Sequence, residues 1–302
     1  MGFDKLFDAL TGEGIRCMQD EPMSRHTTFR IGGPARLMAF PDSETALLFT
    51  IAACCAAGLP YRVVGNGSNL LVADEGVNTL VIITMGIKSP PPDVAGGFLS
   101  ATAGESLTVL CGRACIAGLA GLEFAYGIPG TVGGAVYMNA GAYGGEMKDV
   151  IYSVTVYDPE SGAITDLPVS ELAFGYRRSL FMDRPLIILS AVFRLQAGDR
   201  AEIKARMEDY LSRRRDKQPL DWPSAGSTFK RPEGAYAAAL IDQCGLKGFQ
   251  MGGARVSDKH AGFVINAGGA TCADATALME EVGRVVLEKT GFVLEPEIRV
   301  FR

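Results

Sequence analysis

The stretch Gly65-Asn66-Gly67-Ser68-Asn69-Leu70-Leu71 follows directly on a short apolar run, Tyr61–Val64. Glycines in a tight loop after a strand allow the backbone to come close to a ligand. Successive backbone N–H groups in such a loop form a concavity that holds an anion, usually a phosphate. Ser68 and the two asparagines add short side chains suited to hydrogen bonds with phosphate or ribose. The stretch therefore predicts a loop that binds the diphosphate of a dinucleotide.

This loop differs from the Rossmann fingerprint. Leu70 stands where that motif has its third glycine, and no acidic residue lies near Ile87 and Lys88, about 20 positions on. Asn-Gly is also a strong signal for a hairpin turn. From this loop alone, a diphosphate loop and a plain hairpin turn both remain open.

A second glycine-rich stretch favours the diphosphate loop. Seven of the twenty residues from Tyr126 to Gly145 are glycine, and the stretch begins Tyr126-Gly127-Ile128-Pro129-Gly130-Thr131. Glycine at this density costs backbone entropy and brings no side chain to a core, so we expect the main chain to touch a flat or bulky ligand. A long surface loop is the alternative. It is less favoured because Val132, Val136 and Tyr137 are apolar.

Composition limits the classes of function. The chain has 302 residues, which favours two or three domains. A net charge of −5 gives no broad basic surface for nucleic acid. No basic segment followed by a long apolar one opens the sequence, and no apolar run reaches the roughly 18 residues of a membrane span. We expect a cytoplasmic protein with no nucleic acid or membrane partner.

The cysteines and histidines predict no metal site. Seven cysteines are present without a Cys-x-x-Cys pair, and we expect all of them to be small buried residues in a reducing compartment. The two histidines, His26 and His260, form no compact cluster with them in the sequence.

The hydrophobic pattern predicts a mixed α and β layout, with Ser89–Asp93 as a break between subdomains. The expected helices are Phe3–Leu10, Ser43–Gly58, Ser106–Leu119, Asp199–Lys217, Ala235–Cys244 and Cys272–Thr290. The expected strands are Tyr61–Val64, Leu70–Val72, Leu80–Thr84, Val150–Tyr157, Leu186–Phe193 and Phe292–Arg302.

Three further positions have side chains suited to catalysis. Arg177 lies in an apolar context, where an arginine usually meets a carboxylate of the protein or of a ligand. Ser227 follows Gly226 and precedes Lys230 and Arg231, although a serine in a turn is the more common interpretation. Glu297 follows Pro296, which implies an edge strand or the start of a strand, so Glu297 either borders a cleft or joins a solvated surface row.

Seven motifs in one order resemble the UDP-N-acetylenolpyruvoylglucosamine reductase family, the flavoenzymes of bacterial peptidoglycan precursor synthesis. The resemblance covers about residue 21 to residue 300. The motifs are Thr27–Ala35, Gly65–Leu71, Gly127–Gly130, Asn139–Gly144, Tyr176-Arg177-x-Ser179, Ala225–Ser227 and Leu294–Glu297.

The resemblance implies an α+β fold: an FAD-binding domain of the vanillyl-alcohol-oxidase (PCMH) type in two subdomains, and a C-terminal α+β substrate-binding domain. We assign residues 1–88 and 89–197 to the two FAD-binding subdomains, and 198–302 to the substrate-binding domain. The last strand either stays in the substrate-binding domain or returns to the FAD domain. FAD is expected to bind without a covalent bond, so His26 is not expected to anchor it.

The same resemblance implies roles for single residues. Gly65–Leu70 and Gly127, Ile128, Gly130 and Thr131 would hold FAD. NADPH would reduce the flavin, which would reduce the enolpyruvyl group of a UDP-sugar. Arg177 would counter the charge that builds on the substrate, a preorganised electrostatic effect. Ser227 would donate the proton, and Glu297 would orient the substrate or stabilise the same region.

Some members of the family carry an extra tyrosine-bearing loop between the arginine and serine motifs. Here the charged helix predicted over 201–217 fills most of that interval, so the chain resembles the shorter subtype. The expected residues for the substrate diphosphate are Lys217, Arg231, Lys259 and His260. Cations at the end of a helix also offset its dipole, and His260 has either a substrate contact or a polar structural role. A monomer is expected.

Two other classes of function are compatible with the same sequence features. A flavin oxidase of the same fold would reoxidise rapidly in air without an enolpyruvyl acceptor. A nucleotide-binding protein without catalysis would be colourless, or yellow and not bleached by NADPH.

Overall fold

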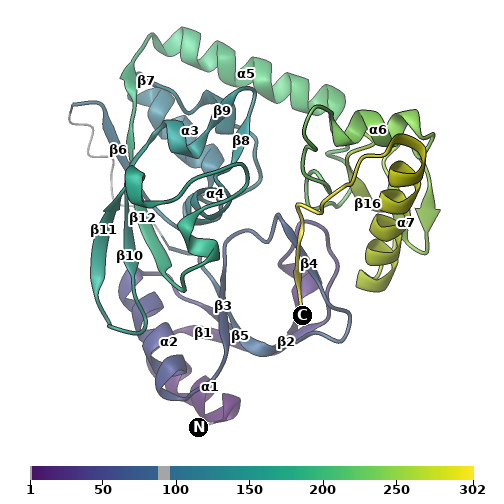
Figure 1. Ribbon diagram of the computed structural model, residues 1–302. Helices are drawn as coiled ribbons and strands as arrows, with labels where there is room; N and C mark the ends of the chain where they lie inside the picture. The colour runs from purple at the N-terminus through teal and green to yellow at the C-terminus, as the bar shows by residue number, and fades with distance from the viewer. Residues whose placement is uncertain (1, 88–95) are drawn as a thin grey trace. The chain divides into compact units, whose positions relative to one another are not determined.

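The computed structural model describes residues 2–87 and 96–302, so the break predicted at Ser89–Asp93 lies outside the described residues. The chain divides into two compact units. The first comprises Met1–Gln19, Leu37–Asn66 and Thr79–Arg213, and the second comprises Asp20–Arg36, Gly67–Asn78 and Arg214–Arg302. The functional ranges assigned from the sequence stay a prediction, because this division follows compactness alone. Figure 1 gives the order of the elements.

One sheet has the strand order β1-β2-β5-β3. Its strands are β1 (Arg16–Pro22), β2 (Pro34–Phe40), β5 (Val77–Ile83) and β3 (Tyr61–Val64), and β3 pairs parallel to β5. Helices α1 (Phe3–Gly12) and α2 (Glu44–Ala56) share a buried cluster with side chains of β2 and β5. Ser43 caps α2: its hydroxyl accepts a hydrogen bond from Ala46 N at 3.3 Å.

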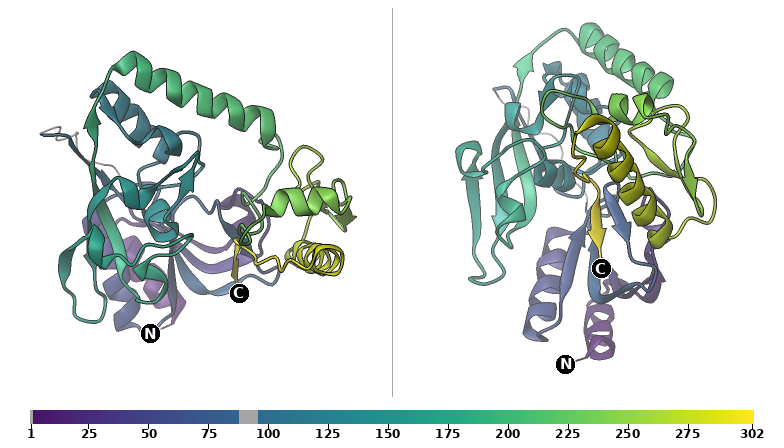
Figure 2. Two further views of the ribbon diagram at one scale, coloured as in Figure 1. Left: turned by 45° about the horizontal axis from the view of Figure 1, so that its top comes forward. Right: turned by 45° about the vertical axis from the view of Figure 1, so that its right-hand side comes forward.

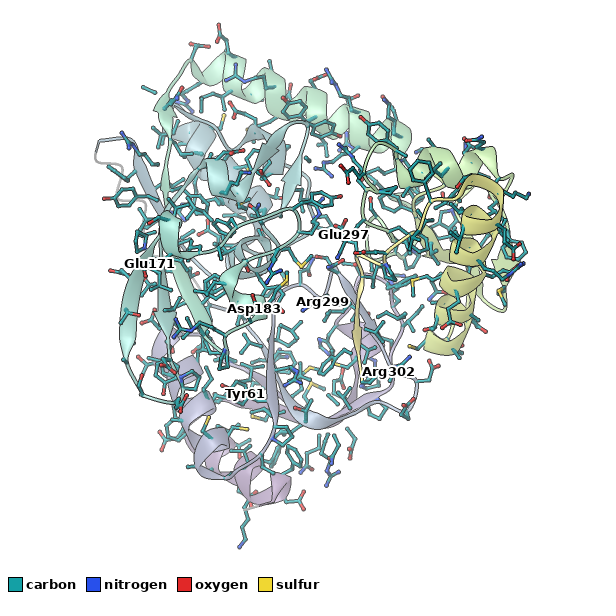
Figure 3. The ribbon with its side chains drawn as sticks, in the orientation of Figure 1. Tyr61, Glu171, Asp183, Glu297, Arg299 and Arg302 are labelled. Atoms are coloured by element: carbon teal, nitrogen blue, oxygen red, sulfur yellow. The ribbon has the colours of Figure 1, made fainter. Side chains whose placement is uncertain are left out.

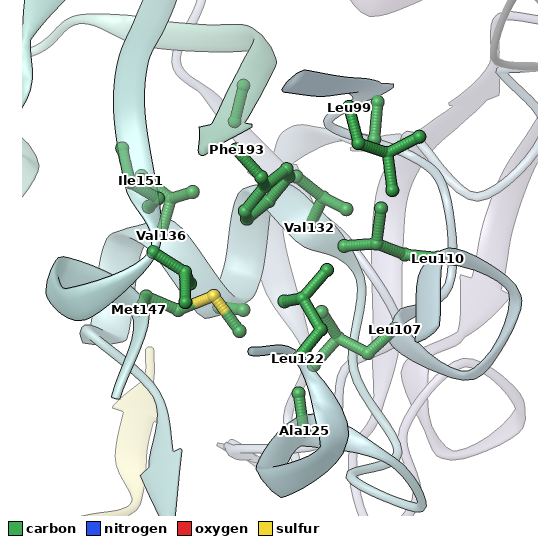
Figure 4. Packing of buried hydrophobic residues seen from close by; sticks show 14 of the residues in the cluster. Leu99, Leu107, Leu110, Leu122, Ala125, Val132, Val136, Met147, Ile151 and Phe193 are labelled. Atoms are coloured by element: carbon green, nitrogen blue, oxygen red, sulfur yellow. The ribbon is translucent and has the colours of Figure 1, made fainter. Parts of the chain in front are cut away.

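A second sheet of the first unit is antiparallel, in the order β11-β10-β12-β6. Its strands are β6 (Phe98–Thr102), β10 (Ile151–Tyr157), β11 (Ile164–Pro168) and β12 (Ile187–Arg194). Helices α3 (Leu107–Ile116) and α4 (Val132–Met138) pack with it. Figure 4 shows Phe193 and Leu99 of the strands beside Val132 of α4 and Leu110 of α3. This core positions the second glycine-rich stretch.

Shorter elements and one long helix complete the first unit. Helix α5 (Arg200–Lys217) is a single continuous helix in both views of Figure 2, and the division into units falls within it, after Arg213. The short strands are β7 (Leu119–Ala120), β8 (Gly141–Ala142), β9 (Gly145–Glu146) and β13 (Gln196–Ala197). The 3₁₀ helices along the chain are Met23–Arg25 (second unit), Glu123–Ala125, Met147–Asp149, Val169–Glu171 and Leu180–Met182.

The second unit combines a small antiparallel sheet with two helices. The sheet has the order β14-β15-β16, and α6 and α7 bury their apolar side chains in one cluster with it. Strand β4 pairs parallel to β17, with Leu70 opposite Arg299. The bounds are β4 (Leu70–Val72), α6 (Ala237–Gln243), β14 (Gln250–Met251), β15 (Ala254–Val256), β16 (Val264–Asn266), α7 (Cys272–Thr290) and β17 (Arg299–Phe301).

Four sequence predictions need correction. The strand expected over Phe292–Arg302 is reduced to β17, and the helix expected over Ser106–Leu119 ends at Ile116. The glycine-rich stretch Tyr126–Gly145 contains the helix α4. Cys55 is exposed, so not every cysteine is buried.

Candidate functional site

The loop after β3 is not a hairpin turn. Strand β3 pairs with β5, whereas β4 pairs with β17, so the strands on either side of the loop belong to different sheets. In the first unit, the start of the loop lies against the second glycine-rich stretch. A Cβ on Gly65 would be 2.2 Å from Thr131 Oγ1, and Asn66 Nδ2 donates to Pro129 O at 2.7 Å. The two loops singled out from the sequence therefore meet at these residues.

The stretch from Gly127 to Thr131 is fixed by main-chain hydrogen bonds. Gly127 has φ +81°, and Gly130 O accepts from Leu107 N at 3.0 Å. The N–H of Gly130 donates to Ile128 O at 2.8 Å, which closes a tight turn. Thr131 begins α4 as its N-cap, with its hydroxyl accepting from Gly134 N at 3.4 Å. The turn is held rigidly where α3 and α4 begin.

The remainder of the first loop belongs to the second unit. Gly67 has φ +59°, and a Cβ there would lie 2.2 Å from His26 O, so only glycine fits. Ser68 follows it in the loop. The side-chain amide of Asn69 donates to Glu297 O at 3.2 Å. His26 itself contacts Glu21, with Nε2 and Oε1 3.0 Å apart.

Ser227 is exposed and directly precedes the anchored residue Thr228. Gly226 has φ +76°, with open space around the position of a Cβ. Thr228 is fully buried; its hydroxyl accepts from Val264 N at 2.9 Å and its N–H donates to Gly262 O at 2.8 Å. The serine hydroxyl is thus presented from a well-fixed backbone.

Glu297 lies beside this serine motif. Its N–H donates to Thr228 O at 2.8 Å, and Phe229 forms an antiparallel bridge with Pro296. Figure 3 labels Glu297 and Arg299 in the last segment of the chain. The second unit therefore brings together Ser227, Glu297 and Asn69, which come from three separate motifs.

Arg177 belongs to the first unit and sits at a strained position. Gly175 and Arg178 exchange both main-chain hydrogen bonds, which makes Tyr176-Arg177 a tight turn. Arg177 has φ +53°, a left-handed conformation that is unfavourable for a residue with a Cβ. Its Nη2 donates to Gly141 O at 3.3 Å, and its guanidinium lies 5.4 Å from the ring centre of Tyr176. Strain of this kind favours a functional role for the arginine.

Three of the four residues expected at the substrate diphosphate lie near one another in the second unit. Lys259 Nζ donates to Arg215 O at 2.5 Å, near the end of α5 where Lys217 lies. Burial lowers the pKa of His260, and the charges of Lys247 and Lys217 lower it further. His260 Nδ1 accepts from Gly262 N at 3.2 Å, which leaves Nε2 as the N–H donor of the neutral ring.

Arg231, the fourth, stacks on an aromatic ring instead. Its guanidinium lies 4.4 Å from the ring centre of Tyr236. Lys230, one of the cations noted beside Ser227, pairs with Glu295 at 3.1 Å.

Three residues contact or shape the candidate site, although the sequence analysis assigned no individual role to any of them. Thr28 donates from its hydroxyl to Ser224 O at 2.7 Å and from its N–H to Gly67 O at 3.3 Å, so it connects the first loop with the serine motif. Asn266 Nδ2 donates to Phe29 O at 3.3 Å. Asn139 ends α4 in the left-handed conformation, φ +42°. Thr28 and Asn139 stand inside the motifs that carried the resemblance, which is the signal that pointed toward them.

Two further findings bear on the class of protein. Among residues 2–87 and 96–302, no cluster of three or more His, Cys, Asp or Glu side chains is arranged to hold a metal ion. No helix in the described part of the chain has both the length and the apolar character needed to cross a membrane.

Comparison with known proteins decides the family. Residues 35–167 match the family model of an FAD binding domain. Residues 218–301 match the C-terminal domain of UDP-N-acetylenolpyruvoylglucosamine reductase. A relative with that name from Caldanaerobacter subterraneus subsp. tengcongensis is 47% identical over 98% of this chain and 97% of its own length. The chain belongs to the UDP-N-acetylenolpyruvoylglucosamine reductase family.

Other members of the reductase family agree. The reductase of Agathobacter rectalis is 48% identical over 94% of this chain and 93% of its own length. The crystal structure of the reductase of Thermus caldophilus superposes with a TM-score of 0.79 and 36% identity, covering 95% of this chain and 99% of that one. The predicted family is confirmed, and so is the predicted fold class: an FAD-binding domain of the vanillyl-alcohol-oxidase type with a C-terminal α+β domain.

Proposed function

We propose that this protein reduces UDP-N-acetylglucosamine enolpyruvate to UDP-N-acetylmuramate, with bound FAD and with NADPH as the reductant. The observation that carries the proposal is the match to reductases of this name over 98% of the chain. The same match favours a reductase over an oxidase of this fold. The UDP-sugar as substrate, NADPH as co-substrate, a cytoplasmic location and a monomeric state are parts of the proposal.

The residues present are suited to FAD. In the described chain, the backbone N–H groups of Asn66, Gly67 and Ser68 donate no hydrogen bond to the protein. Three successive donors of this kind are what a diphosphate needs. We propose that the main chain of Gly65–Leu70 binds the diphosphate, and that Gly127, Ile128, Gly130 and Thr131 flank the flavin. Bound FAD would supply hydride transfer from NADPH to the alkene of the substrate.

The chain's own residues would manage charge and protons. Negative charge builds on the carbon next to the carboxylate as the alkene is reduced, and Arg177 would counter it with paired N–H donors, worth a few kcal/mol. Ser227 would donate its hydroxyl proton to that carbon. Glu297 would orient the substrate beside Ser227. Lys217, Lys259 and His260 would bind the substrate diphosphate, and Arg231 would join them by leaving the ring of Tyr236.

The first prediction tests Ser227 by separating the two half-reactions. Ser227→Ala should be reduced by NADPH at the wild-type rate, because that step needs no proton from the serine. Reoxidation by the enolpyruvyl sugar nucleotide should slow by about 10²- to 10⁴-fold, the usual size of general-acid catalysis. Anaerobic stopped-flow absorbance of the flavin measures both steps.

Ser224→Ala is the matched control, since Ser224 contacts Thr28 through its backbone N–H and C=O. It should keep both rates. If the wild type and Ser227→Ala reoxidise at the same rate, Ser227 is not the proton donor.

A further inference from the structure

The two asparagines of the first loop direct their side-chain amides to different places. Asn66 Nδ2 donates to Pro129 O at 2.7 Å, within the first unit. Asn69 Nδ2 donates to Glu297 O at 3.2 Å, within the second unit. Each amide therefore donates one N–H to a backbone carbonyl of the protein. Their partners differ: one is a turn proposed to flank the flavin, and the other is the main chain of a residue proposed to be catalytic.

The backbone at Glu297 has little regular structure of its own. Glu297 lies between an isolated bridge at Pro296 and the first residue of β17, Arg299. Proline has no backbone N–H, so the residue before Glu297 offers no donor to a neighbouring strand. The position of Glu297 must depend on contacts from elsewhere in the fold.

Thr228 and Asn69 supply two of those contacts. Thr228 O accepts from the N–H of Glu297 at 2.8 Å, and Thr228 is the residue directly after Ser227. The amide of Asn69 binds the carbonyl of Glu297, while the carbonyl of Asn69 accepts from Arg299 N at 2.9 Å. Asn69 thus spans the peptide units on both sides of Ile298. Its backbone bond would survive a substitution, whereas its bond to Glu297 would not.

We propose that the side chain of Asn69 is a positioning residue for Glu297, acting through the Glu297 carbonyl, while its main chain remains part of the FAD loop. The inference rests on the catalytic role proposed for Glu297. It separates two functions within one short loop. The main chain binds the cofactor, and the side chain of Asn69 positions the carboxylate of Glu297 for substrate reduction.

The test replaces Asn69 by leucine, which has a similar size and no N–H donor. Asn69→Leu should retain FAD and be reduced by NADPH at the wild-type rate. Reoxidation by the enolpyruvyl sugar nucleotide should slow ten- to a hundredfold, because a displacement of about 1 Å costs rates of this order. Asn69→Ala, which removes the amide without adding charge, should show the same pattern and serves where the leucine variant does not fold.

The matched control is Asn78→Leu, the same substitution at an exposed asparagine of β5 outside the loop. It should keep the FAD affinity, measured by fluorescence titration of the flavin, and leave the reoxidation rate per bound flavin unchanged. A loss of FAD from Asn69→Leu with normal reoxidation of the flavin that remains would overturn the proposal and make Asn69 a cofactor ligand.

Glu297→Gln distinguishes failure of this inference from failure of the proposed function. If Glu297→Gln reoxidises at the wild-type rate, the role of Glu297 is wrong. If Glu297→Gln is slow and Asn69→Leu is fast, the inference alone fails. When both are slow, Asn69→Leu should add little further loss in the Glu297→Gln background, since the two residues would act as one unit; fully additive losses would count against the inference.

Discussion

At the scale of single residues, Gly67 is the position where the loop has least freedom. It combines a left-handed backbone with a Cβ position 2.2 Å from His26 O. Gly67→Ala should cost about 1–2 kcal/mol for the backbone conformation alone, and more for the collision. The variant should show a lower melting temperature and a lower flavin-to-protein absorbance ratio.

Gly58 is the control for this prediction. It has a similar φ of +65° at the end of α2, and a Cβ there would meet nothing within 4 Å. Gly58→Ala should therefore show the conformational cost only and keep its FAD. If the two alanine variants lose equal stability, the close approach at Gly67 is not what requires glycine.

The type of these residues predicts that their positions are special, but the sequence does not predict which residues they contact. A glycine in a tight loop is visible in the sequence, so Gly67 was predicted to be special. Its neighbour His26 was not predicted to touch it, because nothing local links positions so far apart. The same holds for Asn69: its short side chain predicts a hydrogen bond with phosphate or ribose, and nothing local points to the carbonyl of Glu297, to which its amide donates.

At the scale of elements, Asp74 connects the segment after β4 to the start of α7. Its two carboxylate oxygens accept from Cys272 N at 2.6 Å and from Ala273 N at 3.0 Å. These are N–H groups that have no partner inside the helix. Asp74→Ala should lower the free energy of unfolding by about 1–2 kcal/mol, as the loss of a cap does.

Chemical denaturation measures that loss, with Glu75→Ala as the control. Glu75 is the exposed acidic neighbour of Asp74 in the same segment. An equal effect of both substitutions would point to general charge and not to the cap.

The elements predicted best are those with caps and long apolar periods. Helix α7 has the predicted bounds Cys272–Thr290 and is closed at Gly291 in the left-handed conformation. Helix α4 was missed because its glycines are poor helix formers. A close tertiary contact explains why glycine is needed in this helix: a Cβ on Gly133 would be 2.9 Å from the Cβ of Ala103. The length of the last strand was predicted too long. Its extent depends on pairing with the distant residues Thr228 and Leu70, which the local sequence pattern does not predict.

At the scale of the whole molecule, acid should weaken the fold through His260. Burial and the charges of Lys247 and Lys217 lower its pKa in the folded state, while the unfolded value stays near 6.5. As the pH falls, His260 therefore binds a proton more readily in the unfolded chain than in the folded chain. Stability from this source is present above about pH 6.5 and is lost as the pH falls below it.

Urea unfolding of wild type and His260→Asn between about pH 5 and 7.5 checks this linkage. The difference in unfolding free energy between the two proteins should shrink toward low pH. A difference that stays constant across the range would mean that His260 has an ordinary pKa in the folded state.

The seven cysteines offer an experimental handle. All seven are free thiols within the described residues, and Cys55 is the exposed one. Burial raises the pKa of Cys17 to about 11 and that of Cys54 to about 12, so both remain protonated and slow to react near neutrality. A maleimide dye at pH 7 should consequently attach first at Cys55, and Cys115→Ser would remove the half-buried thiol that competes with it. The label on α2 would then report distance to the flavin by energy transfer.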